Sequence, residues 1–140
     1  MRYSTLETVL DTQLREILAG ELYIARQLPR IAEGVSSSEL RSQLGKAVQE
    51  YNARAERLER VLADRKVLAQ GGHSRTVEAF IRQCAEIVEH RGDDLLLDHG
   101  LVSILRHLEV YERALYESAR EVAHAIDAGH AHQELSLIHI

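Results

Sequence analysis

The sequence predicts an all-α protein, a single antiparallel bundle of long amphipathic helices. One proline and eight glycines in 140 residues interrupt the chain rarely, which favours a few long helices over many short strands. Trp is absent and Phe occurs once, so the core must be built from Leu, Ile, Val and Ala. Apolar residues recur at helical spacing, and the short connections between these stretches make neighbouring helices antiparallel.

The starts of the predicted helices carry capping residues. Ser4 with Glu7, and Ser36 with Glu39, have the spacing of capping boxes, in which side chains bond the free amide groups of the first turn. Asp93 can cap the last helix in the same way. The predicted helices cover residues 4–33, 36–70, 74–91 and 94–128.

Glycines mark the expected ends of these helices, because glycine tolerates the left-handed conformation of a C-terminal cap. These glycines are Gly34, Gly71, Gly72, Gly92 and Gly129.

The first segment has an apolar stripe with one interruption, at Glu21. A carboxylate therefore lies where the helical spacing requires a core residue. The stripe consists of Leu10, Leu14, Ile17, Ile24, Leu28 and Ile31.

The second and third segments have uninterrupted stripes. The second stripe consists of Leu40, Leu44, Ala47, Val48, Tyr51, Ala55, Leu58 and Leu62. The third consists of Val77, Ile81, Cys84 and Val88.

The fourth segment repeats the pattern of the first, with Glu112 in its stripe. Glu21 and Glu112 both lie near the middle of their helices, so we expect them at similar depth in the bundle. The apolar members of the stripe are Leu101, Leu105, Leu108, Leu115, Ala119, Val122 and Ile126.

Two buried carboxylates need a cation, a proton or a hydrogen-bond partner. Inward glutamates on facing helices of a bundle are typical of sites for two iron or manganese ions. Tyr51 also faces inward, so a polar layer that fixes the register of the helices explains Glu21 and Glu112 equally well. Both interpretations stay open from spacing alone.

Glu109 and Glu50 lie on the flanks of their stripes and are candidates for additional metal ligands. Both positions also suit solvated surface acids. His99 and His124 point away from the stripe, and His107 lies at its edge. His130 and His132 lie beyond Gly129 as exposed tail residues, so we expect none of these histidines to be a core ligand.

The charge and composition exclude several classes of function. A net charge of −5 without a basic cluster argues against nucleic acid as a partner. No apolar run is long enough to cross a membrane, and the first residues lack the apolar stretch of a signal peptide. The single cysteine, Cys84, lies on an apolar face and suits a reducing compartment, so we expect a cytoplasmic protein.

Four stretches of the chain carry a family resemblance: LREILAGELYIARQLPRIAEGVSSSEL from Leu14, ERLERV from Glu56, VEAFIRQCAEIVE from Val77 and LEVYERALY from Leu108. Together they resemble the ferritin-like stress-protein family of the YciE/YciF type. Their order and spacing carry the resemblance, which extends from about Leu6 to Leu135.

The resemblance implies a ferritin-like bundle with a short crossover helix, often dimeric, and a dinuclear metal site. It places Glu21, Glu109 and Glu112 at the glutamates of that site. It also implies an association with stress responses, and at such a site any chemistry would be reduction of peroxide or oxygen.

The chain departs from the family where ligands are expected. Ala47 and Asn52 stand where family members have histidine on the second helix, and Gln49 replaces a glutamate. The family's Glu-His pair is Glu109-Val110. The sequence therefore predicts an incomplete iron or manganese site, and whether the protein is an enzyme stays open.

The family continues into a long final helix, which here would begin near Gly129. Because residues 135–140 resemble translated adapter sequence, we expect the domain to cover residues 1–134, the tail to be non-native and most of the final helix to be missing. An apolar face left open in this way favours a homodimer.

The leading hypothesis is therefore a ferritin-like bacterial stress protein with a degenerate dinuclear metal site. The alternative is a non-enzymatic scaffold or dimerisation module with a buried Glu/Tyr layer. A bundle that binds a small molecule in a cavity between its helices is a third interpretation.

Overall fold

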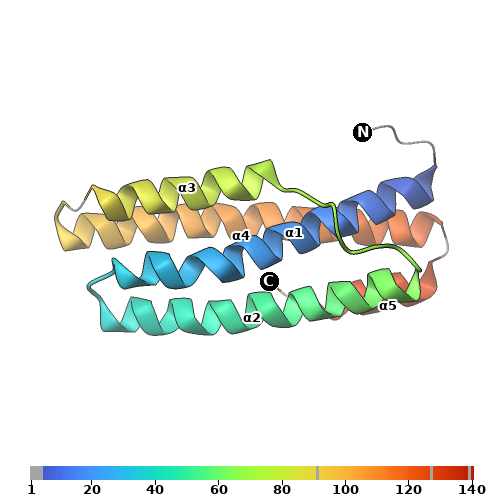
Figure 1. Cartoon of the computed structure of the whole chain (residues 1–140), viewed down its shortest axis with the longest axis horizontal. Coiled ribbons are helices and arrows are strands. Elements are labelled where there is room, and N and C mark those ends of the chain that lie inside the picture. Colours follow the sequence, from blue (N-terminus) through green and yellow to red (C-terminus); the bar gives the residue numbers. More distant parts are fainter. Residues whose placement is uncertain (1–4, 91, 127, 139) are drawn as a thin grey trace.

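The protein is an antiparallel helical bundle in the computed structural model, which describes residues 5–90, 92–126, 128–138 and 140. Figure 1 shows the long helices side by side along one axis. α1 runs antiparallel to α2, and α3 runs antiparallel to α4. No strand occurs in the described ranges. The predicted all-α class and antiparallel arrangement are therefore confirmed. The helices are α1 (Leu6–Glu33), α2 (Ser38–Asp64), α3 (Arg75–Glu89), α4 (Asp94–Ala125) and α5 (Gly129–Ser136).

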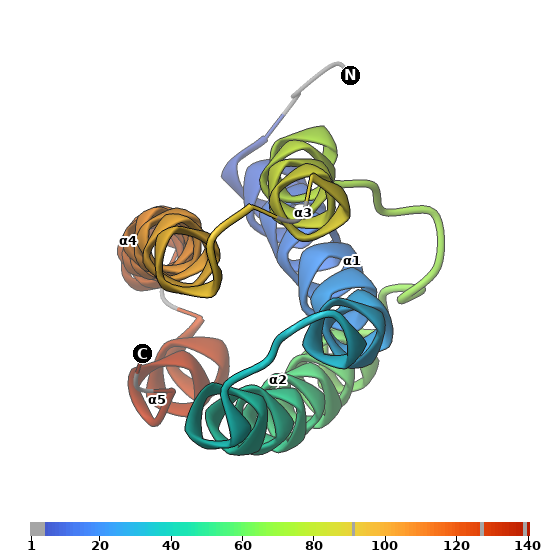
Figure 2. The same ribbon diagram turned by 90° about the vertical axis from the view of Figure 1, so that its left-hand side faces the viewer.

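The helices form a ring when the bundle is viewed along its axis (Figure 2). α1 contacts α2, α3 and α4, whereas α5 contacts α4 and α2 at the opposite side of the ring. α3 is the short helix that the family resemblance implies, and it begins only after the chain has crossed from the far end of α2. α5 begins at Gly129, where the sequence predicts the final helix to begin.

The capping residues differ by one position from the predicted ones. Ser4 lies outside the described residues, and Thr5 caps α1 by accepting from the Thr8 amide at 3.1 Å. Ser37 rather than Ser36 caps α2, since its hydroxyl accepts from the Leu40 amide at 3.2 Å. Several adjacent hydroxyl side chains can serve each of these caps, so spacing alone does not choose between them. The Asp93 cap of α4 is confirmed.

The end of α2 is the largest boundary error, because the helix stops at Asp64 and not at residue 70. Lys66 adopts the left-handed conformation with φ 59°, and the Val67 amide donates to the Leu62 carbonyl at 2.9 Å. This is a Schellman cap built on a lysine instead of a glycine. The prediction therefore missed it.

The predicted glycine caps are only partly confirmed. Gly34 is the C-cap of α1, as predicted, although its φ of −89° is not left-handed. Gly71 is left-handed with φ 92°, but it lies beyond the end of α2 at Asp64. Gly129 is the first residue of α5 and not the cap of α4. Arg65 rather than Gly72 is the C-cap of α2, and His90 rather than Gly92 is the C-cap of α3, so the expectation is also wrong for these two glycines.

The core is divided into two apolar clusters along the bundle. One cluster contains Leu10 and Leu14 of α1 together with Ala131 and Leu135 of α5. The other joins the second half of α1 to α3 and to the first halves of α2 and α4. Glu21 lies between them in the sequence of α1, because Leu18 belongs to the first cluster and Ile24 to the second.

The tail of the chain contacts the core. Leu135 is fully buried, and Ile138 is 6% exposed within the same cluster as the start of α1. The expected domain boundary at residue 134 and the non-native origin of residues 135–140 stay predictions. In the described part of the chain no helix is both long and apolar enough to cross a membrane.

Candidate functional site

The two predicted core glutamates both point into the bundle. Glu21 on α1 is 1% exposed and Glu112 on α4 is 2% exposed, which places them among the most buried side chains of the described residues. The sequence-based expectation that both face inward is therefore confirmed. Carboxyl groups so far from water are stable only when their charge is removed or balanced.

Arg54 of α2 balances the charge of Glu21. Its Nε donates to Glu21 Oε2 at 2.7 Å, and the arginine side chain is only 11% exposed. A charge-assisted hydrogen bond between two buried groups is short and strong, and neither partner has water to replace the other. Arg54 therefore supplies the cation that Glu21 requires.

Tyr51, one turn before Arg54 on α2, holds Glu112. The Tyr51 hydroxyl donates to Glu112 Oε1 at 2.8 Å, and the Arg54 guanidinium carbon lies 4.4 Å from the centre of the Tyr51 ring. The ring face attracts the guanidinium, so one residue orients both a carboxyl group and the cation. The sequence placed Tyr51 beside either glutamate, and the structure selects Glu112.

Glu112 is a neutral acid in the folded protein at neutral pH. Burial raises the pKa of Glu112 to about 10, and the hydrogen bond and negative charge of Glu21 act in the same direction. By contrast, the Tyr51 hydrogen bond and the charge of Arg54 lower that pKa. Glu112 Oε2 is buried without a donor to accept from. A proton on Oε2 makes this atom a donor toward Glu21, which explains why it has none.

Tyr116 completes the layer on the α4 side. It lies one turn after Glu112 and is 2% exposed, and its hydroxyl finds no partner of normal hydrogen-bond geometry. Burial, followed by the charge of Glu21, raises the pKa of Tyr116, so the phenol stays neutral. The name core polar layer is used below for Glu21, Tyr51, Arg54, Glu112 and Tyr116.

Glu50 and Glu109, the other two predicted ligands, do not join the core polar layer. Both side chains are exposed on their helices. Glu109 lines a cavity of about 270 Å³ between α2 and α4, in which Tyr51 is also present. Within the described ranges, no group of three or more His, Cys, Asp or Glu side chains could hold a metal ion.

Sequence reasoning missed two members of the layer. Tyr116 was hidden because the α4 stripe was centred one residue too early, so that Leu115 and Val122 were expected inside. In the structure these two are half-buried, whereas Tyr116 and Ala123 are buried. The four-residue spacing from Glu112 to Tyr116 was a usable signal.

Arg54 gave a weaker signal, because an arginine beside an apolar stripe is normally a surface residue. Its three-residue spacing from Tyr51 was the available indication, since positions three apart are neighbours on a helix.

Comparisons with known proteins agree with this architecture. A family described as "Domain of unknown function (DUF892)" matches residues 5–139. No curated protein matches the chain significantly.

Two solved structures share the fold. The Escherichia coli stress protein YciF superposes with a TM-score of 0.89 at 21% identity, over 96% of this chain and 85% of that one. YcfI of Rhodopseudomonas palustris, a proposed structural protein, superposes with a TM-score of 0.88 at 24% identity, over 96% of this chain and 88% of that one. The predicted resemblance to the YciE/YciF type and the ferritin-like class are confirmed.

Replacing Glu21 by Gln should destabilise the protein by about 3 kcal/mol, because it leaves Arg54, whose side chain is 11% exposed, without a counter-charge. Urea denaturation of the purified variant measures this loss. Glu50→Gln removes an exposed acid on the neighbouring helix and should change stability little. If the ion pair is the cause, the double variant Glu21→Gln/Arg54→Met should lose much less stability than the sum of the losses of the two single variants.

Replacing Glu112 by Gln should flatten the pH dependence of stability. Between the unfolded pKa of about 4.3 and the folded value of about 10, the native protein holds a proton that the unfolded chain has released. The free energy of unfolding therefore falls as pH rises through this window, by up to about 1.4 kcal/mol per pH unit. The amide keeps both hydrogen bonds but cannot titrate.

Denaturation at several pH values between 5 and 9 tests this expectation. Glu109→Gln, an exposed acid on the same helix, serves as the matched control and should keep the slope of the parent. An unchanged slope in Glu112→Gln would show that Glu112 is ionised in the folded protein.

Proposed function

The chain belongs to the DUF892 family, and we propose that it is a structural helical bundle of the stress-protein type that needs no metal. The observation that carries this proposal is the ion pair of Arg54 with Glu21 at 2.7 Å. The cation demanded by the buried carboxylates is part of the protein itself. This corresponds to the scaffold alternative, with an arginine added to the expected Glu/Tyr layer.

The residues of the core polar layer do not fit a dinuclear centre. Iron and manganese bind ionised carboxylates, but here Glu21 is engaged by the Arg54 guanidinium and Glu112 by the Tyr51 hydroxyl. The second helix adds no inward acid, since Glu50 is exposed. A metal ion and the Arg54 guanidinium would compete for the same oxygen atom.

A structural role also agrees with how the layer is placed. It joins α1, α2 and α4 through directional bonds between two apolar clusters, and a layer of this kind fixes the register of a bundle. The YcfI neighbour is itself a proposed structural protein. Both observations support a scaffold without catalytic chemistry.

The metal-independent interpretation predicts that protein incubated with Fe²⁺ or Mn²⁺ and then desalted retains far less than one ion per chain. Metal analysis measures the retained ions, and the melting temperature should not change on addition of Mn²⁺. Retention of one or two ions that disappears in Glu21→Gln would contradict the proposal.

A second variant tests the part played by Arg54. Arg54→Ala removes the built-in cation, so Mn²⁺ should raise the melting temperature of this variant more than that of the parent protein. If both respond equally, Arg54 does not occupy the place of a cation.

We further propose that the protein is a cytoplasmic homodimer. The cavity of about 270 Å³ between α2 and α4 has apolar residues beside polar ones, and a second copy can cover this surface. Its lining includes Leu40, Ala47, Val102 and Leu105 together with Gln43, Arg106 and Glu109. Cys84 is a buried free thiol, which suits a reducing compartment.

Sedimentation equilibrium should give twice the mass of the chain, and Leu105→Glu should shift the protein toward the monomer by placing a charge in this surface. Leu68→Glu changes a leucine that is 78% exposed beyond the end of α2, and it should leave the mass unchanged. A parent protein that is monomeric at high concentration would contradict the dimer.

A further inference from the structure

Two histidines lie close together at the junction of α4 and α5. Neither belongs to the core polar layer. The ring of His124 on α4 lies 5.5 Å from the ring of His132 on α5, centre to centre, and their planes make an angle of 49°. Neither ring makes a hydrogen bond or an ion pair with a residue in the described part of the chain. The ring nitrogens are thus free to bind a ligand.

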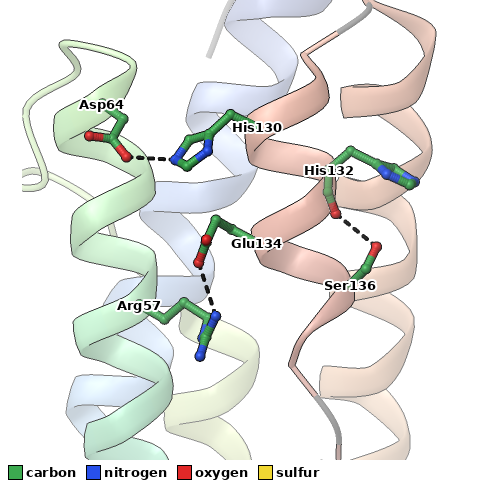
Figure 3. A network of polar contacts seen from close by, with 6 residues as sticks. All are labelled: Arg57, Asp64, His130, His132, Glu134 and Ser136. Carbon is green, nitrogen blue, oxygen red and sulfur yellow. Dashed lines mark hydrogen bonds and ion pairs between the residues drawn. The ribbon is translucent and has the colours of Figure 1, made fainter.

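His132 differs in this respect from its neighbours on α5. Figure 3 shows His130 and Glu134 reaching toward α2, where they bind Asp64 and Arg57, while the His132 ring points to the other side. His130 Nε2 lies 2.7 Å from Asp64 Oδ2, and Arg57 Nη1 lies 2.9 Å from Glu134 Oε2. Each of these side chains has a partner on α2, whereas His132 has only His124.

The separation of the two rings agrees with a shared metal ion. At a metal–nitrogen distance of about 2.0–2.1 Å, the centre of an imidazole ring lies roughly 3.2 Å from the ion, so two rings at the tetrahedral angle have centres about 5.2 Å apart. The observed 5.5 Å is close to this value. Both side chains are at least partly exposed, so small rotations and entry of the ion are open to them.

We propose that His124 and His132 bind one divalent transition-metal ion of the kind that accepts imidazole ligands, with Zn²⁺ as the representative. Imidazole nitrogen suits Zn²⁺, Cu²⁺ and Ni²⁺ and not Mg²⁺ or Ca²⁺. Water completes the coordination, because the protein supplies two ligands. This site is separate from the core polar layer and independent of the proposed structural function.

Binding at this site fastens α5 to α4. α5 has eight residues, too few for a helix that is stable without tertiary contacts. Its polar contacts with α2 lie at the surface, where ion pairs add little. A metal bridge between His124 and His132 closes the turn between the two helices and opposes separation of α5 from the bundle.

Calorimetric titration of the untagged protein with Zn²⁺ tests the site. We expect one ion per chain at the His124/His132 site. His124→Ala or His132→Ala should lower the affinity at least about tenfold, since loss of even an outer-shell partner of a metal ligand has such an effect. His130→Ala is the matched control on the same helix and should bind Zn²⁺ like the parent protein. Circular dichroism checks that each variant is folded.

Hydrogen exchange supplies a second measurement. Zn²⁺ should slow the exchange of the α5 amides in the parent protein and in His130→Ala, but not in His132→Ala. Equal binding by the parent and His132→Ala, no binding up to millimolar Zn²⁺, or loss of binding only in His130→Ala would each overturn the proposal. Glu112→Gln, which keeps the hydrogen bonds of the core polar layer, should leave the titration unchanged, which separates this site from any metal bound in the core.

Discussion

The ion pair between Arg54 and Glu21 is the interaction on which the interior of this bundle depends. Two carboxyl groups lie at the same level of the core, and Arg54 is the one cationic side chain among the described residues that pairs with them. The solution is asymmetric: Glu21 pairs with the guanidinium, whereas burial raises the pKa of Glu112 so that it keeps a proton. The layer as a whole is therefore close to neutral, which is what a core of low polarity requires.

This asymmetry also positions the helices. α2 provides both Tyr51 and Arg54 from consecutive turns, so one helix face binds α1 through one carboxyl group and α4 through the other. A shift of α2 by one turn would break both bonds at once and leave buried polar groups unpaired. The two apolar clusters tolerate many combinations of side chains, but the polar layer accepts one register.

Periodicity predicted most of the fold because burial on a helix repeats with the helical turn. It correctly placed Glu21 and Glu112 inside, along with the α1 stripe from Leu10 to Ile31. It failed where the deciding contact is long-range or where several local choices are equivalent. Arg54 becomes a core residue only because Glu21 lies opposite to it, and the cap of α2 is chosen among three adjacent serines by geometry that spacing does not contain.

Because the chain contains no tryptophan, the tyrosines of the core polar layer can be followed by near-ultraviolet spectroscopy. Tyr51 and Tyr116 are the two aromatic side chains of the described residues that are buried, and both belong to the core polar layer. The asymmetric surroundings of these two rings therefore contribute a signal to the near-ultraviolet circular dichroism of the protein. A state that keeps its helices but loosens the layer would lose this signal while the far-ultraviolet spectrum persists. The integrity of the ion pair can be followed optically, without any added label.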